Sequence, residues 1–165
     1  MSLFMLRGTG DARWVPTIAD PNLGITAAEW TAGQPLGLSI NAIEGLEPQS
    51  NKINVPILKK RTEEQIDGPQ TFQDVSITIA EDDGTGTSLE ALERQEVLEV
   101  LVKGASGYIV LNRSSQTTPT TGSKLWVIGG TVSEQVPNWS LDAAAATTQI
   151  RISPSTPLTP VAVKA

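Results

Sequence analysis

Residues Asp74-Val75-Ser76-Ile77-Thr78-Ile79-Ala80 decide the fold class of this chain. Apolar and polar residues alternate through the segment, so Val75, Ile77 and Ile79 share one face. That period of two is typical of a β-strand with one buried and one solvated face. The sequence therefore predicts a sheet that packs one side onto a core.

Further runs of the same kind lie on both sides of this segment. Alternating or continuous apolar stretches occupy residues 38–42, 53–57, 108–111, 124–136 and 148–153. The longest of them contains Gly129-Gly130, which favours a bulge or bend within one long strand. Six or seven such strands indicate a mainly β protein, an antiparallel β-sandwich or open barrel.

One flanking α-helix is predicted over residues 88–103. Thr87 and Glu90 have the spacing of a capping box, and the segment contains neither glycine nor proline until Gly104. Leu89, Val97 and related positions form an apolar stripe. We expect this helix to lie on the sheet.

Three segments lack an apolar pattern. Residues 1–22 are broken by glycine and proline, and residues 154–165 contain Pro154, Pro157 and Pro160. Both are predicted to be extended arms outside a sandwich of residues 23–153. Residues 59–72 form a charged interstrand loop, which is either mobile or ordered by a partner.

The composition excludes several chemistries. The 165 residues include no histidine and no cysteine, which removes Ser-His-Asp and Cys-His nucleophiles, disulfides and the usual zinc and haem ligands. We expect no catalytic residues, cofactor or metal, and neither a signal peptide nor a membrane span. The formal charge of -6 argues against tight duplex-DNA binding.

The densest acidic cluster is Glu81-Asp82-Asp83-Gly84-Thr85-Gly86. It lacks the alternate spacing of an EF-hand loop, because Gly84 stands where the third-position ligand should be. We interpret it as a solvated turn before a helix, and leave open whether Asp82 and Asp83 bind a cation. The carboxylate pair Glu63 and Glu64 likewise has no sign of burial.

Chain segments that stay outside a sandwich are ordered most readily by neighbouring subunits. The two arms and the charged loop therefore predict an assembling protein. The hypothetical inter-subunit contacts are Arg13, Trp14, Lys59, Lys60, Arg61, Glu63, Glu64, Asp67, Pro154, Pro157 and Pro160.

The order of these elements resembles that of a known family. A glycine-broken start (Arg7-Gly8-Thr9-Gly10-Asp11-Ala12-Arg13-Trp14), strands around a charged loop, one helix, a late strand pair and a proline-rich end are similar to the major tail tube proteins of long-tailed, siphovirus-type bacteriophages. The likeness covers nearly the whole chain. It implies a non-enzymatic virion protein, assembled in the host cytoplasm.

The resemblance also implies how such a protein works. Six copies form a ring, rings stack into a tube, and DNA passes through an acidic lumen without specific binding. Tail tip, tape measure and terminator proteins are the implied partners. Ser133, Gln135, Gln149 and Arg151 would be candidates for the tube wall. The alternatives are a tube protein of a contractile injection or secretion system and a monomeric carbohydrate-binding β-sandwich module.

Overall fold

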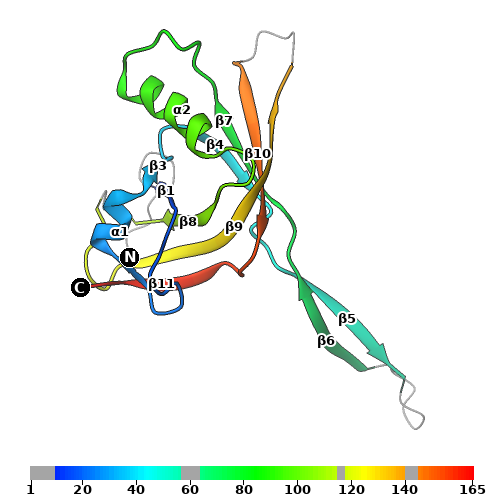
Figure 1. The fold of residues 1–165 in the computed structure, drawn as a ribbon. Coiled ribbons are helices and arrows are strands. Elements are labelled where there is room, and N and C mark those ends of the chain that lie inside the picture. The colour runs from blue at the N-terminus through cyan, green and yellow to red at the C-terminus, as the bar shows by residue number, and fades with distance from the viewer. Residues whose placement is uncertain (1–9, 57–63, 115–117, 140–144) are drawn as a thin grey trace, which may run out of the picture.

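The computed structural model describes residues 10–56, 64–114, 118–139 and 145–165. Within them lie eleven strands and two helices (Figure 1). The strands are β1 Asp11–Val15, β2 Ile25–Thr26, β3 Gln34–Pro35, β4 Ile40–Glu44, β5 Gln49–Val55, β6 Glu64–Thr71, β7 Val75–Ala80, β8 Ser106–Asn112, β9 Lys124–Pro137, β10 Thr147–Pro154 and β11 Thr159–Lys164; the helices are α1 Ala27–Ala32 and α2 Leu89–Val100.

One sheet forms the body of the protein. Its strands run in the order β3-β1-β8-β9-β10-β7-β4, and all pairs along that path are antiparallel. Strand β11 pairs with β9 and, in parallel, with β2. The sequence prediction of a mainly β, antiparallel fold is confirmed.

Strand β9 connects the two halves of the sheet. Along one edge it pairs with β8, and along the other it pairs first with β11 and then with β10. The change of partner occurs beside Gly130. A Cβ atom at this position would lie only 2.7 Å from the Cγ2 atom of Ile152. The irregularity in the ladder falls instead at Ser133, which is passed over between the pairs Ile152–Val132 and Arg151–Glu134. The bulge predicted at Gly129-Gly130 therefore lies at Ser133, and Gly130 instead allows close packing.

Two hydrophobic clusters lie on opposite faces of the sheet, because the neighbouring residues Ile109 and Val110 of β8 belong to different clusters, and each cluster contains one tryptophan. Trp14 belongs to the larger cluster, and Trp30 belongs to the smaller one. The larger cluster contains Ala12, Trp14, Leu36, Val75, Ile77, Ile79, Val97, Leu101, Ile109, Ile128, Val132, Ile150 and Ile152. The alternating face of β7 is therefore buried as the sequence predicts.

The predicted helix is present as α2, slightly shorter than residues 88–103. It begins after Ser88, whose hydroxyl accepts a hydrogen bond from the Ala91 N–H at 3.2 Å. Thr87 was the expected cap, but the cap lies one residue later. Val97 and Leu101 anchor the helix to the main cluster.

A second helix, α1, was not predicted. It is six residues long and starts with a capping box between Thr26 and Glu29. The Thr26 hydroxyl accepts from the Glu29 N–H, and the Glu29 carboxylate accepts from the Thr26 N–H. The run is too short to show helical periodicity, because one and a half turns hold a single buried residue, Trp30.

The N-terminal segment is not a free arm. Residues Asp11–Val15 form β1, which pairs with β8 inside the sheet. Trp14 is only 1% exposed. The prediction of an arm over residues 1–22 is therefore wrong for β1, which is too short to show a clear alternation between Gly10 and Pro16. Residues 1–9 lie outside the described part of the chain.

The C-terminal segment is also part of the sheet. Strand β11 places Val161 and Val163 in the smaller cluster. Pro160 is the second residue of β11, is exposed, and lies opposite Trp126 of β9. The prediction of an extended arm over residues 154–165 is therefore wrong for β11, because proline is tolerated where its missing N–H faces away from the ladder.

The charged loop predicted over residues 59–72 is in part a strand. Residues Glu64–Thr71 form β6, which pairs with β5 as a separate two-stranded sheet. Residues 53–55 of β5 fall in the predicted strand 53–57, whereas β6 was missed because Ile66 is its single large apolar residue and the strand shows no apolar alternation. Residues 57–63, at the turn, lie outside the described part.

Candidate functional site

The hairpin of β5 and β6 projects away from the body of the protein (Figure 1). Ile53 and Ile66 are directly opposite each other in its register and are 48% and 52% exposed. A lone two-stranded hairpin is marginally stable in water, and an exposed isoleucine pair adds no core to it. The geometry therefore offers an apolar contact point, held at a distance from the subunit's own core.

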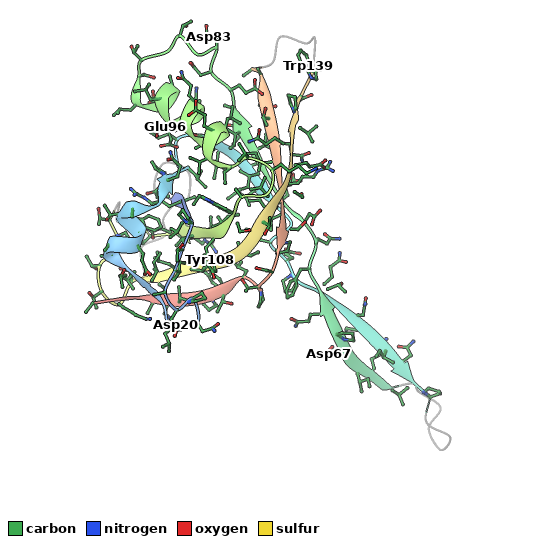
Figure 2. The ribbon with its side chains drawn as sticks, in the orientation of Figure 1. Asp20, Asp67, Asp83, Glu96, Tyr108 and Trp139 are labelled. Atoms are coloured by element: carbon green, nitrogen blue, oxygen red, sulfur yellow. The ribbon has the colours of Figure 1, made fainter. Side chains whose placement is uncertain are left out.

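Charged groups accompany this pair. Asp67, which Figure 2 labels on the hairpin, lies opposite Lys52, and both side chains are exposed. Glu64 begins β6. The other charged residues that the sequence singled out, Lys59, Lys60, Arg61 and Glu63, lie outside the described residues. The structure thus places Asp67 and Glu64 on the projecting hairpin and leaves their contacts as a prediction.

Arg13 and Trp14 serve the subunit itself. The Arg13 guanidinium donates to the carbonyls of Trp30 and Thr31 at 3.1 Å each, and its central carbon lies 5.1 Å from the Trp30 ring centroid. It thereby caps the carbonyl end of α1, where a positive charge is favoured. Because the Trp14 side chain is buried, the predicted contact of Trp14 with another subunit is wrong.

The three prolines of the C-terminal segment lie in different settings. Pro154 ends β10 opposite Gly130 and is half-buried. Pro157 and Pro160 are exposed. The latter two offer surface to a neighbour, and an inter-subunit role for them stays a prediction.

The acidic turn is held by its own hydrogen bonds. Asp82 accepts from the N–H groups of Gly84 and Gly86 at 3.2 Å and from the Gln95 amide at 3.0 Å. Asp83 accepts from the hydroxyl and the N–H of Thr85, which hold the pKa of the Asp83 carboxyl below its usual value. Within the described residues no group of three or more acidic side chains could hold a metal ion.

A polar face runs across β7, β10 and β9, opposite the main core. Gln149 and Arg151 lie beside Thr78 and Ser76 of β7. The Arg151 guanidinium forms an ion pair with Glu134 at 2.7 Å. Of the four wall candidates, Gln149, Arg151 and Ser133 border this face.

Gln135, the fourth wall candidate, points the other way. Its amide donates to the carbonyls of Leu98 and Leu101 at 3.0 and 2.7 Å, so it caps the end of α2. It is therefore a structural residue of the subunit. Its position opposite Ile150, an inward-facing residue of β10, explains the difference.

Sequence reasoning did not single out Trp139 as a surface feature. It follows β9, near the tip of the β9–β10 hairpin, and is 90% exposed (Figure 2). Tryptophan is enriched at protein interfaces. Pro137, two residues before Trp139 and at the end of a strand, was the sequence signal that this tryptophan lies in a connection.

In the described part of the chain no helix has the length and apolar character that a membrane crossing requires.

Comparison with known proteins gives a family and a fold. A family model described as "Phage tail tube protein" matches residues 3–165. None of the curated proteins matches the chain.

Several solved structures have a similar fold. One is a chain of the anti-feeding prophage baseplate, with 10% identity, a TM-score of 0.59 and full coverage of both chains. Another is a chain from the sheath/tube terminator of an extracellular contractile injection system, with 10% identity, a TM-score of 0.58 and coverage of 98% and 99% of the two chains. A third, from the sheath-tube complex of such a system, has 12% identity, a TM-score of 0.53 and coverage of 93% and 88%.

Proposed function

This chain belongs to the phage tail tube protein family, and from that premise we propose that it is the repeating subunit of a tail tube. Its role is structural, and it is a component of the virion. The projecting hairpin carries the proposal, because its exposed pair Ile53 and Ile66 gains cover only from another molecule.

We further propose that six copies form a ring and that rings stack into a tube. A contact between unlike surfaces, such as a hairpin and the body of the next copy, is heterologous and can close into a ring or continue along a filament. Asp67 and Glu64 of the hairpin, together with Lys59, Lys60, Arg61 and Glu63, are proposed to line that contact. Exposed Pro157 and Pro160 are proposed to contribute on the body.

The same assembly would let DNA pass without adhering. Each subunit carries a formal charge of -6, which a ring multiplies by its copy number. Like charges repel a phosphate backbone within about one Debye length, roughly 8 Å at physiological ionic strength. The polar face with Gln149, Arg151 and Glu134 is a suitable tube wall, because the Glu134 carboxylate neutralises the Arg151 guanidinium there.

Terminator, tail tip and tape measure proteins are the proposed partners at the tube's ends and in its lumen. A tube protein of a contractile injection system is the second candidate. It is supported by the fold that this chain shares with chains of such systems. Electron microscopy of native particles that contain this protein would separate the two, since only a contractile tube is surrounded by a sheath.

Negative-stain electron microscopy of the purified protein tests the proposed function. Rings or tubes with a regular repeat are expected as the concentration rises. Monomers of 17.5 kDa at every concentration, in both microscopy and sedimentation, would contradict self-assembly and favour a monomeric binding module.

A further inference from the structure

An apolar groove of about 980 Å³ opens between β1 and β4 of the main sheet. Gly10 and Ala12 lie on one side of it, Ile40 and Ile43 of β4 lie on the other, and Trp126 of β9 contributes to its lining. The volume is at the upper end of the range for sites that hold a drug-sized ligand, roughly 300–1,000 Å³.

The groove is an uncovered part of the core. Five of its neighbours are only partly buried although they pack directly on the main hydrophobic cluster; these are Ile40, Ile43, Leu46, Leu111 and Leu158. Contiguous apolar surface of this kind is usually covered in the functional state of a protein. The surface therefore requires an occupant with several large apolar side chains.

We propose that the occupant is the N-terminal segment of the same chain, with Leu3, Phe4, Met5 and Leu6 packed in the groove. These four consecutive residues are all large and apolar. Gly10, which is itself part of the lining, is the residue at which the described chain begins. The apolar run and the apolar groove are thus adjoining parts of one chain.

The length of the connection favours the chain's own segment over that of another copy. Leu6 and Gly10 are joined through Arg7, Gly8 and Thr9, and the four steps between them span at most about 14 Å when extended. A tether this short gives an effective concentration in the millimolar range. The two glycines of Gly8-Thr9-Gly10 permit the reversal that brings the segment back over the groove.

This docking does not depend on the proposed tube function, because it concerns the single chain. It assigns the segment before β1 to the subunit's own core. The free subunit would then present a covered groove, and the isoleucine pair of the hairpin would remain exposed.

Cross-linking in the natural cysteine-free background tests the proposal. The pair Phe4→Cys with Asn41→Cys joins the segment to the groove, where Asn41 is an exposed lining residue of β4. The matched control pairs Phe4→Cys with Gln65→Cys, an exposed residue of the projecting hairpin. A short bis-maleimide is added at a concentration where sedimentation shows monomers, and intact mass identifies links within one chain.

Docking predicts that the groove pair links within the chain at least about tenfold faster than the control pair, independently of protein concentration. Adding Leu3→Ser and Leu6→Ser to the groove pair should bring its rate down to that of the control. Circular dichroism verifies that each variant is folded. Assembly is scored separately, so a protein that forms no tubes still reports on the groove.

Three results would overturn the proposal. Equal rates for the two pairs would show that the segment is not held at the groove. An unchanged rate after the serine substitutions would show that the tether alone brings the thiols together. Concentration-dependent links between chains would assign the groove to the segment of another copy.

Discussion

Replacing both isoleucines of the hairpin pair, Ile53→Ser with Ile66→Ser, should weaken assembly and leave the subunit folded. The two side chains face each other across β5 and β6 and are about half exposed. They belong to neither hydrophobic cluster of the body. Their removal therefore acts on a surface that only a neighbouring copy would cover.

The magnitude follows from the exposed fraction. Complete burial of an isoleucine side chain contributes about 1.5–3 kcal/mol. Covering the exposed half of each side chain is therefore worth about 1 kcal/mol, and covering the pair is worth about 2 kcal/mol per contact. At about 1.4 kcal/mol for each factor of ten, the critical concentration for assembly should rise roughly 30-fold.

Pelleting of polymer by ultracentrifugation across a concentration series measures that critical concentration. The neighbouring pair Asn54 and Gln65 provides a matched control, because its residues are also opposite each other and exposed but polar. The double change Asn54→Ser with Gln65→Ser should alter assembly little. Loss of the isoleucine pair should cost the isolated subunit less than about 1 kcal/mol of unfolding free energy, the upper range for a cross-strand pair.

An unchanged critical concentration in the isoleucine variant would refute the reasoning. So would equal impairment in the polar control, because the effect would then not come from apolar burial. A large loss of thermal stability in the monomer would mean that the pair supports the fold instead.

Three further predictions concern the subunit. Changing Glu93 to Ala should lower the unfolding free energy by about 1–3 kcal/mol in urea titration, because its carboxylate accepts at 2.9 Å from the N–H of Leu38 and the hydroxyl of Ser39, which would lose a buried partner. Changing Gly107 to Ala should cost about 1–3 kcal/mol, measured in the same way, because the new Cβ would lie 2.8 Å from the Trp14 ring. Changing Glu29 to Gln should make the melting temperature depend less on pH in the acid range, measured by thermal unfolding across a pH series. The capping hydrogen bonds lower the Glu29 pKa in the folded state, so the carboxylate's contribution is present above about pH 4.5 and lost as the pH falls through the folded value.

The failures of sequence prediction share a physical cause. Strand β1 and strand β11 are short and flanked by glycine or proline, so composition indicated arms. Their burial depends on pairing with β8 and β9, which are distant in the sequence. Long-range pairing of this kind leaves no local period to detect when a strand has only two or three inward residues.

The sequence by itself determined the mainly β class, the position of α2 and the inward face of β7, because those features depend on local periodicity and capping. It also determined which chemistries the chain lacks, since no histidine or cysteine is present. Only the tertiary structure decided that Trp14 is core, that Gln135 caps a helix, and that residues 64–71 extend a hairpin into solvent. Those outcomes depend on which strands pair and what then covers each face, and neighbours along the chain do not encode that.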